Sequence, residues 1–229
     1  MELYGQQSKS IPQKTVIILA EVLLLLLSYY LLFQNGTQYL FEFVGLATTA
    51  GNMGSRILIF SFSIIVFLRM TFMMLYLLKR KIPSEEAFSV PFAFSLYFVG
   101  FSLFGFNRTH ALDWFDAFAV LLFVVGSVLN TGGELLRHFW KQKPENKGKI
   151  YTEGFFKYSM HINYFGDLLW VIAYAIVTLN IYAAAIPVML FCLFAFWNIP
   201  ILDKYLAEKY KAQFDAYSAS TKKFIPFIW

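Results

Sequence analysis

The stretch from Val16 to Phe33, VIILAEVLLLLLSYYLLF, decides the fold class of this chain. Glu21 is the only charged residue in it, and its length is close to the roughly twenty residues that an α-helix needs to cross the hydrocarbon core of a bilayer. The complete sequence of 229 residues is 59% hydrophobic and 14% charged, whereas soluble domains are about 25% charged. The sequence therefore predicts an all-α, polytopic membrane protein.

Further apolar runs follow the first one. They are Ile57–Leu78, Phe88–Phe106, Ala111–Leu136, Tyr164–Leu179 and Ile181–Ile199. The last two are close enough in the chain to form a hairpin. Beyond Pro200, apolar and aromatic residues recur at helical spacing among charged ones, which predicts an amphipathic helix on the membrane surface. We therefore expect a bundle of about six transmembrane helices with an interfacial helix near the C-terminus.

The lysines and arginines indicate the orientation of these spans. The basic residues of both terminal segments and of the loops at 79–81 and 137–157 all fall on one side of the expected bundle, and Arg56 and Arg108 fall on the other. Basic residues favour the cytoplasmic side, so both termini are predicted to be cytoplasmic.

The lysines flank apolar runs, so we expect no nucleic-acid partner. The single cysteine, Cys192, lies in an apolar run, and no metal site is predicted.

Polar side chains gather at the ends of the fourth and fifth runs. Each run contributes four residues spaced i, i+4, i+7 and i+11, and this spacing places them on one helical face. They are Asn130, Glu134, Arg137 and Lys141 in the fourth run, Asn163, Asp167, Trp170 and Tyr174 in the fifth, and the loop between adds Tyr151, Tyr158 and His161. Carboxylates inside apolar stretches are costly and usually face a polar cavity. The two faces therefore predict a pocket, open to the cytosol, for a polar ligand.

Four short segments carry a resemblance to a known family. They are NTGGE (130–134), YTEGFFKY (151–158), HINYFGD (161–167) and KKFIPFIW (222–229). With these segments in this order and spacing, residues from about 126 to 229 resemble the C-terminal domain of the steroid 5α-reductase family. The chain looks most like the bacterial and fungal membrane proteins of undefined substrate that share this domain. The resemblance implies a cofactor-binding domain over 126–229 and a substrate cavity among the helices of 1–125.

In that family the corresponding residues help to hold NADPH. The resemblance implies this role for Asn130, Glu134, Lys141, Asn163, Tyr164 and Asp167. Glu134 and Asp167 are the reverse acids of the commonest family pattern, an exchange of one carboxylate for another. Together with the polar faces described above, the expected cofactor-binding set is Asn130, Glu134, Arg137, Lys141, Tyr151, Tyr158, His161, Asn163, Tyr164 and Asp167.

The activity that the resemblance implies is the NADPH-dependent reduction of a carbon–carbon double bond in a lipophilic, sterol-like or isoprenoid-like substrate taken from the membrane lipid. Such a reduction needs a proton donor that polarises the substrate carbonyl. The donor is expected in the N-terminal helices, where Glu21 and Tyr97 are the candidate catalytic residues and Tyr30 is a further candidate donor. Glu21 and Arg69 lie at similar depths on antiparallel helices, and either an ion pair or a role in the substrate cavity would explain them.

Two alternatives remain open. Membrane methyltransferases that act on isoprenylcysteine or on phospholipid amines share this architecture and use S-adenosylmethionine. They typically carry Arg-His-Pro before the tyrosine, and this chain has Met160, His161 and Ile162 there. The missing arginine, which would help to clamp the cofactor, disfavours this alternative. The third possibility is a non-catalytic, lipid-binding membrane protein that has kept the fold.

Overall fold

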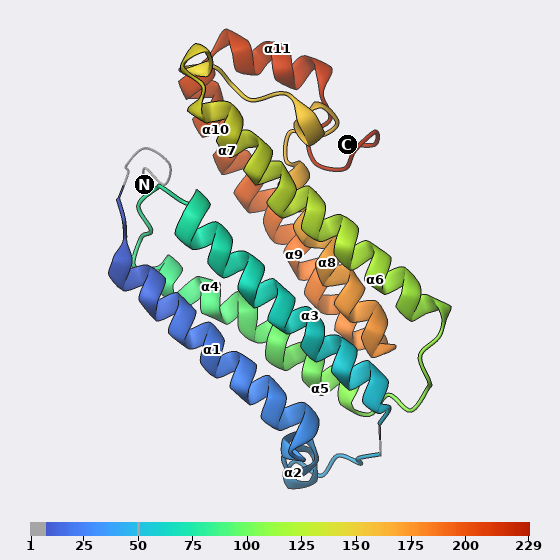
Figure 1. Ribbon diagram of the computed structural model, residues 1–229. Coiled ribbons are helices and arrows are strands. Elements are labelled where there is room, and N and C mark those ends of the chain that lie inside the picture. The colour runs from blue at the N-terminus through green and yellow to red at the C-terminus, as the bar shows by residue number, and fades with distance from the viewer. Residues whose placement is uncertain (1–7, 50) are drawn as a thin grey trace. The chain divides into compact units, whose positions relative to one another are not determined.

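A computed structural model describes residues 8–49 and 51–229, and these residues form helices joined by loops, with no strand among them (Figure 1). In this part of the chain, five helical segments are long and apolar enough to cross a membrane. They are Ile11–Phe33, Met53–Leu77, Glu86–Phe106, Trp114–Gln142 and Ile181–Tyr210, and Ile162–Thr178 is a shorter apolar helix. The predicted all-α fold is confirmed, and it fits a multi-pass membrane protein.

Each long segment is built from several consecutive elements. The α-helices are α1 (Ile11–Phe33), α2 (Gly36–Phe43), α3 (Met53–Phe72), α4 (Glu86–Ser95), α5 (Phe101–Phe106), α6 (Trp114–Ser127), α7 (Gly133–Gln142), α8 (Ile162–Thr178), α9 (Ala185–Leu193), α10 (Ile199–Tyr210) and α11 (Ala212–Ser220). Turns of π-helix are η1 (Met73–Leu77), η2 (Leu96–Gly100), η3 (Val128–Gly132) and η7 (Phe194–Asn198). Short 3₁₀-helices are η4 (Pro144–Asn146), η5 (Gly154–Lys157) and η6 (Ile181–Ala184).

The amphipathic helix predicted beyond Pro200 consists of two helices. The π turn η7 comes directly before α10, and its wider winding gives room to the ring of Pro200, which has no N–H and would clash with a regular preceding turn. The last long segment therefore continues through Pro200 to Tyr210. It ends at Lys211, whose φ of 48° is incompatible with a continuing helix. The helix boundary thus lies at Lys211 and not at Pro200, where the composition changes.

The chain divides into two compact units, and the first consists of Met1–Leu121 and Val171–Ile186. In its described part, α1 packs against α3, α4 and α5 (Figure 1). Near the start of α1, the Lys14 ammonium donates to the carbonyl oxygens of Met74 and Leu78 at 2.6 and 3.0 Å. These carbonyls lie in and just after η1, where a helix end leaves acceptors without partners, so Lys14 caps that end.

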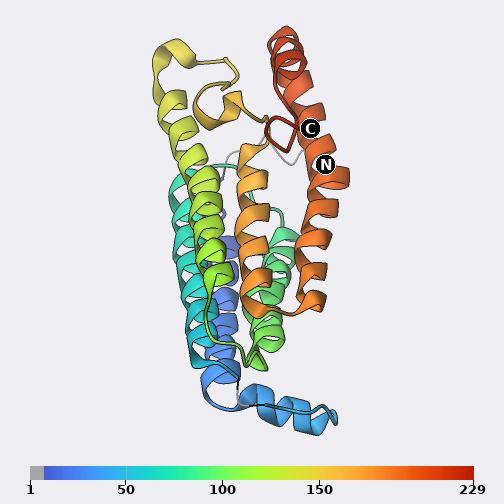
Figure 2. The ribbon, with the colours of Figure 1, turned by 90° about the vertical axis from the view of Figure 1, so that its right-hand side faces the viewer.

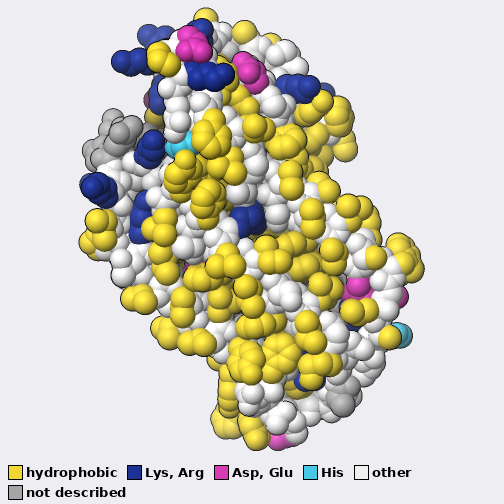
Figure 3. All heavy atoms as spheres, viewed as in Figure 1, with side chains coloured by type: hydrophobic (Ala, Val, Ile, Leu, Met, Phe, Trp, Pro, Cys, Tyr) yellow, Lys and Arg dark blue, Asp and Glu magenta, His cyan; other side chains and the backbone are white. Residues whose placement is uncertain are grey.

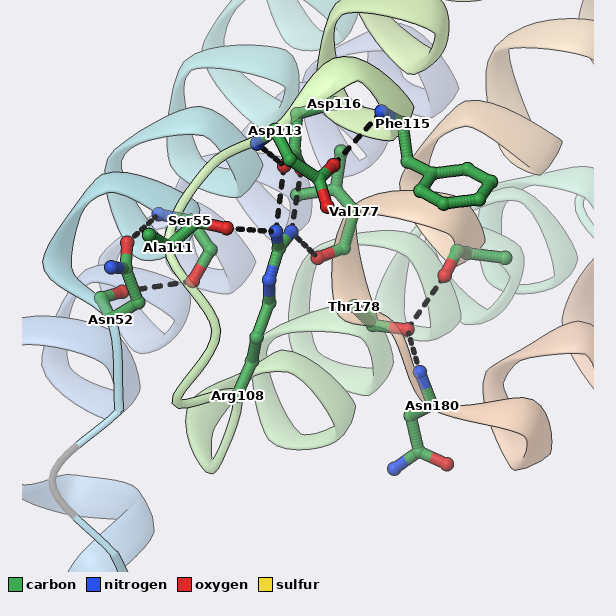
Figure 4. Close-up of polar contacts among 11 residues, drawn as sticks. Asn52, Ser55, Arg108, Ala111, Asp113, Phe115, Asp116, Val177, Thr178 and Asn180 are labelled. Carbon is green, nitrogen blue, oxygen red and sulfur yellow. Dashed lines mark hydrogen bonds and ion pairs between the residues drawn. The ribbon is translucent and has the colours of Figure 1, made fainter.

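A buried ion pair connects three segments at the other end of α3 (Figure 4). The Arg108 guanidinium donates two hydrogen bonds to the Asp116 carboxylate, at 2.5 and 2.6 Å. It also donates to the carbonyl oxygens of Val177 at 2.7 Å and of Ala111 at 3.2 Å. The side chains of Arg108 and Asp116 are only 1% and 6% exposed. These four residues, called the Arg108 cluster below, tie the loop after α5 to the first turn of α6 and to the end of α8.

The second unit consists of Leu122–Trp170 and Pro187–Trp229. Its part of α8 lies between α6–α7 and α9–α10 (Figure 2). A Cβ on Gly126 of α6 would lie 2.5 Å from the carbonyl oxygen of Gly166, and a Cβ on Gly166 of α8 would lie 2.6 Å from that of Gly126. Only glycine allows this close approach of the two backbones, and the approach brings the polar residues of α7 and α8 near one another.

The last segment of the chain, residues 222–229, runs alongside the segment that precedes α8 and is called the C-terminal strap below. The backbone N–H groups of Met160 and His161 donate to the carbonyl oxygens of Lys222 and Lys223 at 2.8 and 3.1 Å. These bonds fix the strap to the start of α8, although about sixty residues separate the two segments in the chain.

Helix α11 packs on the same region. Phe214 and Tyr217 form a buried cluster with Met160, and the Tyr217 hydroxyl donates to the Phe156 carbonyl oxygen at 2.6 Å. Burial raises the pKa of Tyr217 above its usual range. Lysine and arginine side chains gather at the end of the second unit that carries α11 (Figure 3). This distribution fits a helix at the membrane surface next to apolar spans.

Candidate cofactor site

Polar residues of η3, α7 and α8 meet inside the second unit. The Asn163 side-chain amide donates to Glu134 Oε1 at 2.9 Å, and the Asn130 amide donates to the backbone carbonyl oxygen of Asn163 at 3.3 Å. Arg137 donates to Glu134 Oε2 at 2.5 Å. We call Asn130, Glu134, Arg137 and Asn163 the α7–α8 cluster. The two polar faces expected from the sequence do meet in these four residues, and their binding of a cofactor stays a prediction.

The α7–α8 cluster is open on one side. The Glu134 side chain is 12% exposed and the Arg137 side chain is 45% exposed. Both oxygens of Glu134 have partners inside the cluster, but each carboxylate oxygen has room for a second hydrogen bond. The cluster can therefore accept a hydrogen bond from a hydroxyl or ammonium group of a ligand without losing the contacts that it already has.

Lys141, which lies one helical turn beyond Arg137, has partners outside the α7–α8 cluster. Its ammonium donates to the carbonyl oxygen of Lys149 and to the Tyr210 hydroxyl, the latter at 3.1 Å. It also lies over the ring of Trp140, at 5.3 Å from the centroid, and over that of Tyr210, at 5.0 Å. The structure thus directs the Lys141 ammonium toward α10 and the loop after α7.

The polar face of α8 ends earlier than its spacing indicates. The Trp170 indole donates to Asp167 Oδ1 at 2.8 Å, and Trp170 itself is buried. Tyr174 is fully buried in the first unit, where its hydroxyl donates to Ser63 Oγ at 3.2 Å and its ring stacks on Phe101 at 5.0 Å. Tyr174 is therefore a core residue, and only Asn163 and Asp167 of this face remain as candidates for contact with a cofactor.

His161 and Tyr164 are organised by a stack of rings and by an acid that the sequence analysis did not include. The His161 ring stacks on Tyr164, with 5.7 Å between centroids, and Tyr164 stacks on Phe194 at 4.6 Å. His161 Nε2 lies 2.8 Å from Oδ1 of Asp203, a residue of α10. Oδ2 of Asp203 lies 3.1 Å from the ammonium of Lys223 in the C-terminal strap. Asp203 reads in the sequence as one more charge of an amphipathic helix, so no local signal marks it.

The two loop tyrosines lie in different surroundings. Tyr151 is buried with Phe156, and its ring lies 5.3 Å from that of Trp140. Burial and, less strongly, the charge of Glu153 raise the pKa of Tyr151. Tyr158 is exposed, and its ring lies 5.7 Å from that of Phe227 in the C-terminal strap. Tyr151 thus supports the loop after α7, and Tyr158 contacts the strap. Their predicted contact with a cofactor is untested.

The candidate catalytic residues Glu21 and Tyr97 both belong to the first unit. Glu21 is 1% exposed, and its Oε2 has no hydrogen-bond partner among the described residues. The ion pairs of the described chain do not include one between Glu21 and Arg69. Tyr97 is buried on η2 with its ring 5.7 Å from that of Phe94, whereas Tyr30 is exposed. A catalytic role for Glu21 or Tyr97 stays a prediction.

The fold and the α7–α8 cluster define the class: a multi-pass helical membrane protein with polar side chains gathered where two helices approach closely. The chain belongs to the family described as protein of unknown function (DUF1295), whose model matches residues 3–221.

Part of this sequence is similar to three relatives. Protein-S-isoprenylcysteine O-methyltransferase B of Arabidopsis thaliana is 27% identical over 121 residues, which are 50% of this chain and 61% of the relative. Protein-S-isoprenylcysteine O-methyltransferase of Saccharomyces cerevisiae is 28% identical over 102 residues, 44% of this chain and 42% of the relative. Probable O-methyltransferase ustE of Ustilaginoidea virens is 32% identical over 90 residues, 39% of this chain and 32% of the relative.

The chain spans less than two thirds of the length of each of these relatives. Two of the three are named as protein-S-isoprenylcysteine O-methyltransferases and the third as a probable O-methyltransferase. This finding supports the S-adenosylmethionine-dependent methyltransferase, the alternative activity expected from the sequence, better than the NADPH-dependent reductase.

Proposed function

We propose that this protein is a membrane methyltransferase that uses S-adenosylmethionine to methylate a lipophilic, prenyl-like substrate. The observation that carries the proposal is that the three relatives described above all bear the names of O-methyltransferases. The α7–α8 cluster supports it, because it offers acceptors and amides at an accessible edge of the second unit. A lipophilic substrate would reach an enzyme of this fold from the bilayer, and a soluble cofactor would reach it from the aqueous side.

The residues of the α7–α8 cluster fit the polar groups of S-adenosylmethionine. This cofactor supplies an electrophilic methyl group on a sulfonium, and it carries ribose hydroxyls, an ammonium and a carboxylate but no phosphate. Glu134 would accept from the hydroxyls or the ammonium, and Arg137 would bind the carboxylate.

The missing arginine of the Arg-His-Pro pattern does not weigh against this proposal as strongly as the sequence indicates. Met160 stands in its place and is buried with Phe214 and Tyr217 beneath α11. The position therefore serves the packing of α11 in this chain. Arg137, which is 45% exposed and belongs to the α7–α8 cluster, would supply the cation instead.

The second candidate is the NADPH-dependent reductase, and the observation that favours it is the contact of the Asn163 amide with Glu134 inside the segment that resembles the reductases. The 2′-phosphate of NADPH needs a cation that can turn toward it. Lys141, the cation expected to bind this phosphate, is held by Tyr210 and by a backbone carbonyl. This engagement of Lys141 favours the cofactor without phosphate.

Calorimetric titration of the purified protein in lipid nanodiscs with S-adenosylmethionine, NADPH and NADH distinguishes the candidates. We expect binding of S-adenosylmethionine and an affinity that the Lys141→Ala variant keeps within about twofold, because the cofactor has no phosphate for Lys141 to bind. Binding of NADPH that the Lys141→Ala variant weakens far more than binding of NADH would overturn the methyltransferase in favour of the reductase. Binding of none of the three would leave the non-catalytic, lipid-binding protein.

The orientation is also a proposal. The lysines of the loop after α7 and of the segment from α10 onward favour a cytoplasmic position for that end of the second unit and for both termini. Labelling of single cysteines introduced at the exposed positions His110, in the loop that contains Arg108, and Lys147 with a membrane-impermeant reagent on intact cells checks it, in a background where Cys192 is replaced by serine. Labelling at position 147, with protection at 110, would contradict the proposed orientation.

A further inference from the structure

His161 and Asp203 form a buried pair between segments that lie 42 residues apart in the chain. His161 is 1% exposed, and the Asp203 side chain is 14% exposed. An unpaired carboxylate in such surroundings would cost several kcal/mol, so the pair is a built contact and not an accidental one. It joins the start of α8 to α10 at the level of the predicted cofactor residues Tyr164 and Asn163.

The ring of His161 has little freedom to rotate. One face stacks on Tyr164 with 9° between the ring planes, and Tyr164 stacks in turn on Phe194 with 13° between the planes. The His161 backbone N–H donates to the Lys223 carbonyl oxygen at 3.1 Å and to Ser159 Oγ at 3.3 Å. Backbone and ring are thus both held, and in the neutral imidazole the remaining variable is which ring nitrogen carries the proton.

The C-terminal strap reaches the same aspartate from the other side. The Lys223 ammonium lies 3.1 Å from Asp203 Oδ2, while the Lys223 carbonyl oxygen accepts from His161. Ser159 Oγ donates to the carbonyl oxygen of Phe224 at 2.8 Å, and the Phe224 side chain is fully buried. The strap therefore holds the Asp203 carboxylate in the position from which it meets His161.

We infer that Asp203 is a positioning residue that fixes the Nε2–H tautomer of His161. In a neutral imidazole one nitrogen donates and the other accepts, and the bond made by one nitrogen decides the role of the other. With Nε2–H donating to Asp203, Nδ1 becomes an acceptor for a hydroxyl or ammonium group of a ligand. The use of this acceptor for S-adenosylmethionine rests on the proposed function, whereas the tautomer itself does not.

Nitrogen NMR of the protein labelled with ¹⁵N-histidine in nanodiscs reports the tautomer directly. The chain has three histidines, so His110 and His138 serve as internal references. We expect the neutral His161 of the wild type to carry its proton on Nε2. In the Asp203→Asn variant the amide can donate to Nε2, so we expect the Nδ1–H form to become the main one. Asp215→Asn removes an exposed carboxylate from α11 and should leave His161 unchanged.

Titration with S-adenosylmethionine gives the second readout. We expect Asp203→Asn to lower the affinity about fivefold or more, while Asp203→Glu, which keeps the carboxylate, restores most of it. Lys223→Met removes the second partner of Asp203 and keeps the His161 pair, so it should preserve the tautomer. Lys223→Met also keeps the inference testable if Asp203→Asn lowers the yield of folded protein. A changed tautomer in Lys223→Met, which still has Asp203, would contradict the assignment of the tautomer to Asp203.

Two results would overturn the inference: a wild-type His161 with its proton on Nδ1, or an Asp203→Asn variant that keeps both the Nε2–H form and the affinity. A changed tautomer with unchanged affinity would remove the link between this pair and the cofactor. A wild type that binds no S-adenosylmethionine would overturn the proposed function, and the tautomer would still decide the role of Asp203.

Discussion

The Arg108 cluster and the α7–α8 cluster are built from the same kinds of groups but differ in what they leave available. In the Arg108 cluster both charged side chains are nearly inaccessible, and the guanidinium donates to one carboxylate and two carbonyl oxygens. In the α7–α8 cluster the ion pair of Glu134 and Arg137 lies at an exposed edge. The first arrangement gives its hydrogen bonds to the fold, and the second keeps room for another partner.

This difference separates structural from functional polar groups in a chain with few charges. A polar group inside an apolar bundle is costly, so each one needs a reason to be there. For Arg108 the reason is the connection of the loop after α5 to α6 and α8. For Glu134 the contacts with Asn163 and Arg137 hold the carboxylate in place while one side stays accessible. The two clusters should therefore respond in opposite ways to substitution.

The largest effect is expected for Arg108→Ala. Removing one partner of a buried ion pair leaves Asp116 without compensation and costs about 3–5 kcal/mol of the free energy of unfolding. Chemical unfolding in detergent measures this loss. Arg80→Ala is the matched control, because Arg80 pairs with Glu86 where the two side chains are 26% and 22% exposed, and such pairs contribute about 1 kcal/mol or less.

The protein that remains folded after Arg108→Ala should bind S-adenosylmethionine with unchanged affinity. Equal losses of stability for the Arg108 and Arg80 variants would show that the burial of the pair has no special importance. A loss of cofactor affinity in the Arg108 variant, measured below its unfolding transition, would remove the distinction between the two clusters.

The second prediction concerns Glu134→Gln. The amide keeps the size of the side chain and loses the charge, so a charge-assisted hydrogen bond to the cofactor worth about 1.5–3 kcal/mol is lost, which corresponds to at least about a tenfold weaker affinity. The free energy of unfolding should change by less than about 1 kcal/mol, since Arg137, the partner in the ion pair, is 45% exposed. Calorimetric titration measures the affinity. Glu145→Gln, on the exposed loop after α7, is the control, and an equal affinity of both variants would exclude Glu134 from the site.

The third prediction concerns α11. Its Tyr217 makes a buried hydrogen bond to Phe156, so this contact, like the Arg108 cluster, is inaccessible to a ligand. Burial raises the pKa of Tyr217 in the folded protein, whereas an unfolded tyrosine ionises near pH 10. Above that pH the unfolded state binds fewer protons than the folded state, so the free energy of unfolding falls as the pH rises.

Tyr217→Phe removes this titration together with the hydrogen bond to Phe156. The variant should be about 1 kcal/mol less stable at neutral pH, and its stability should decline less steeply than that of the wild type above pH 10. Unfolding by denaturant between pH 8 and 11 measures both. The exposed Tyr158 provides the control variant Tyr158→Phe, and parallel curves for Tyr217→Phe and the wild type would contradict the prediction.

The smallest effect is expected for Glu21→Gln. Glu21 is buried like the charges of the Arg108 cluster, and like Glu134 it has an oxygen that could accept a further hydrogen bond. It is as buried as Arg108, but its Oε2 has no hydrogen-bond partner in the described chain. No ion pair is lost in the substitution, and the amide has a similar shape, so stability should change by less than about 1 kcal/mol. Thermal unfolding measures this, with Glu85→Gln on the surface as control. A loss of several kcal/mol would reveal an ion pair.

Much of the fold follows from the sequence because hydropathy reports directly on membrane crossing. The predicted run Val16–Phe33 corresponds to α1, and the predicted run Phe88–Phe106 corresponds to Glu86–Phe106. The short helix α2 has no such signal, since its eight residues are far fewer than a span needs. The π turns are also invisible, because the same apolar residues would fit a regular helix.

The candidate site shows a different limit. Spacing places Asn130 and Glu134 on one helical face, because residues four apart share a face, and the alternating direction of the spans places Asn163 at the same end of the bundle. Lys141 satisfies the same rule, yet its long side chain reaches Tyr210 instead. Asp203 could not be found at all, since spacing relates residues within one helix and its contact with His161 depends on how α8 and α10 pack.

The π turn η3, at Val128–Gly132, has a consequence for how residues are matched between members of the family. Such a turn is equivalent to one inserted residue, and removing it would rotate all of α7 by about 100° relative to α6. A relative without the turn would need a one-residue gap in the alignment at this point. If the gap were omitted, the residue written in the column of Glu134 would face a different neighbour. Evolutionary comparison of this helix is therefore reliable only when homologous positions are defined by superposition in space.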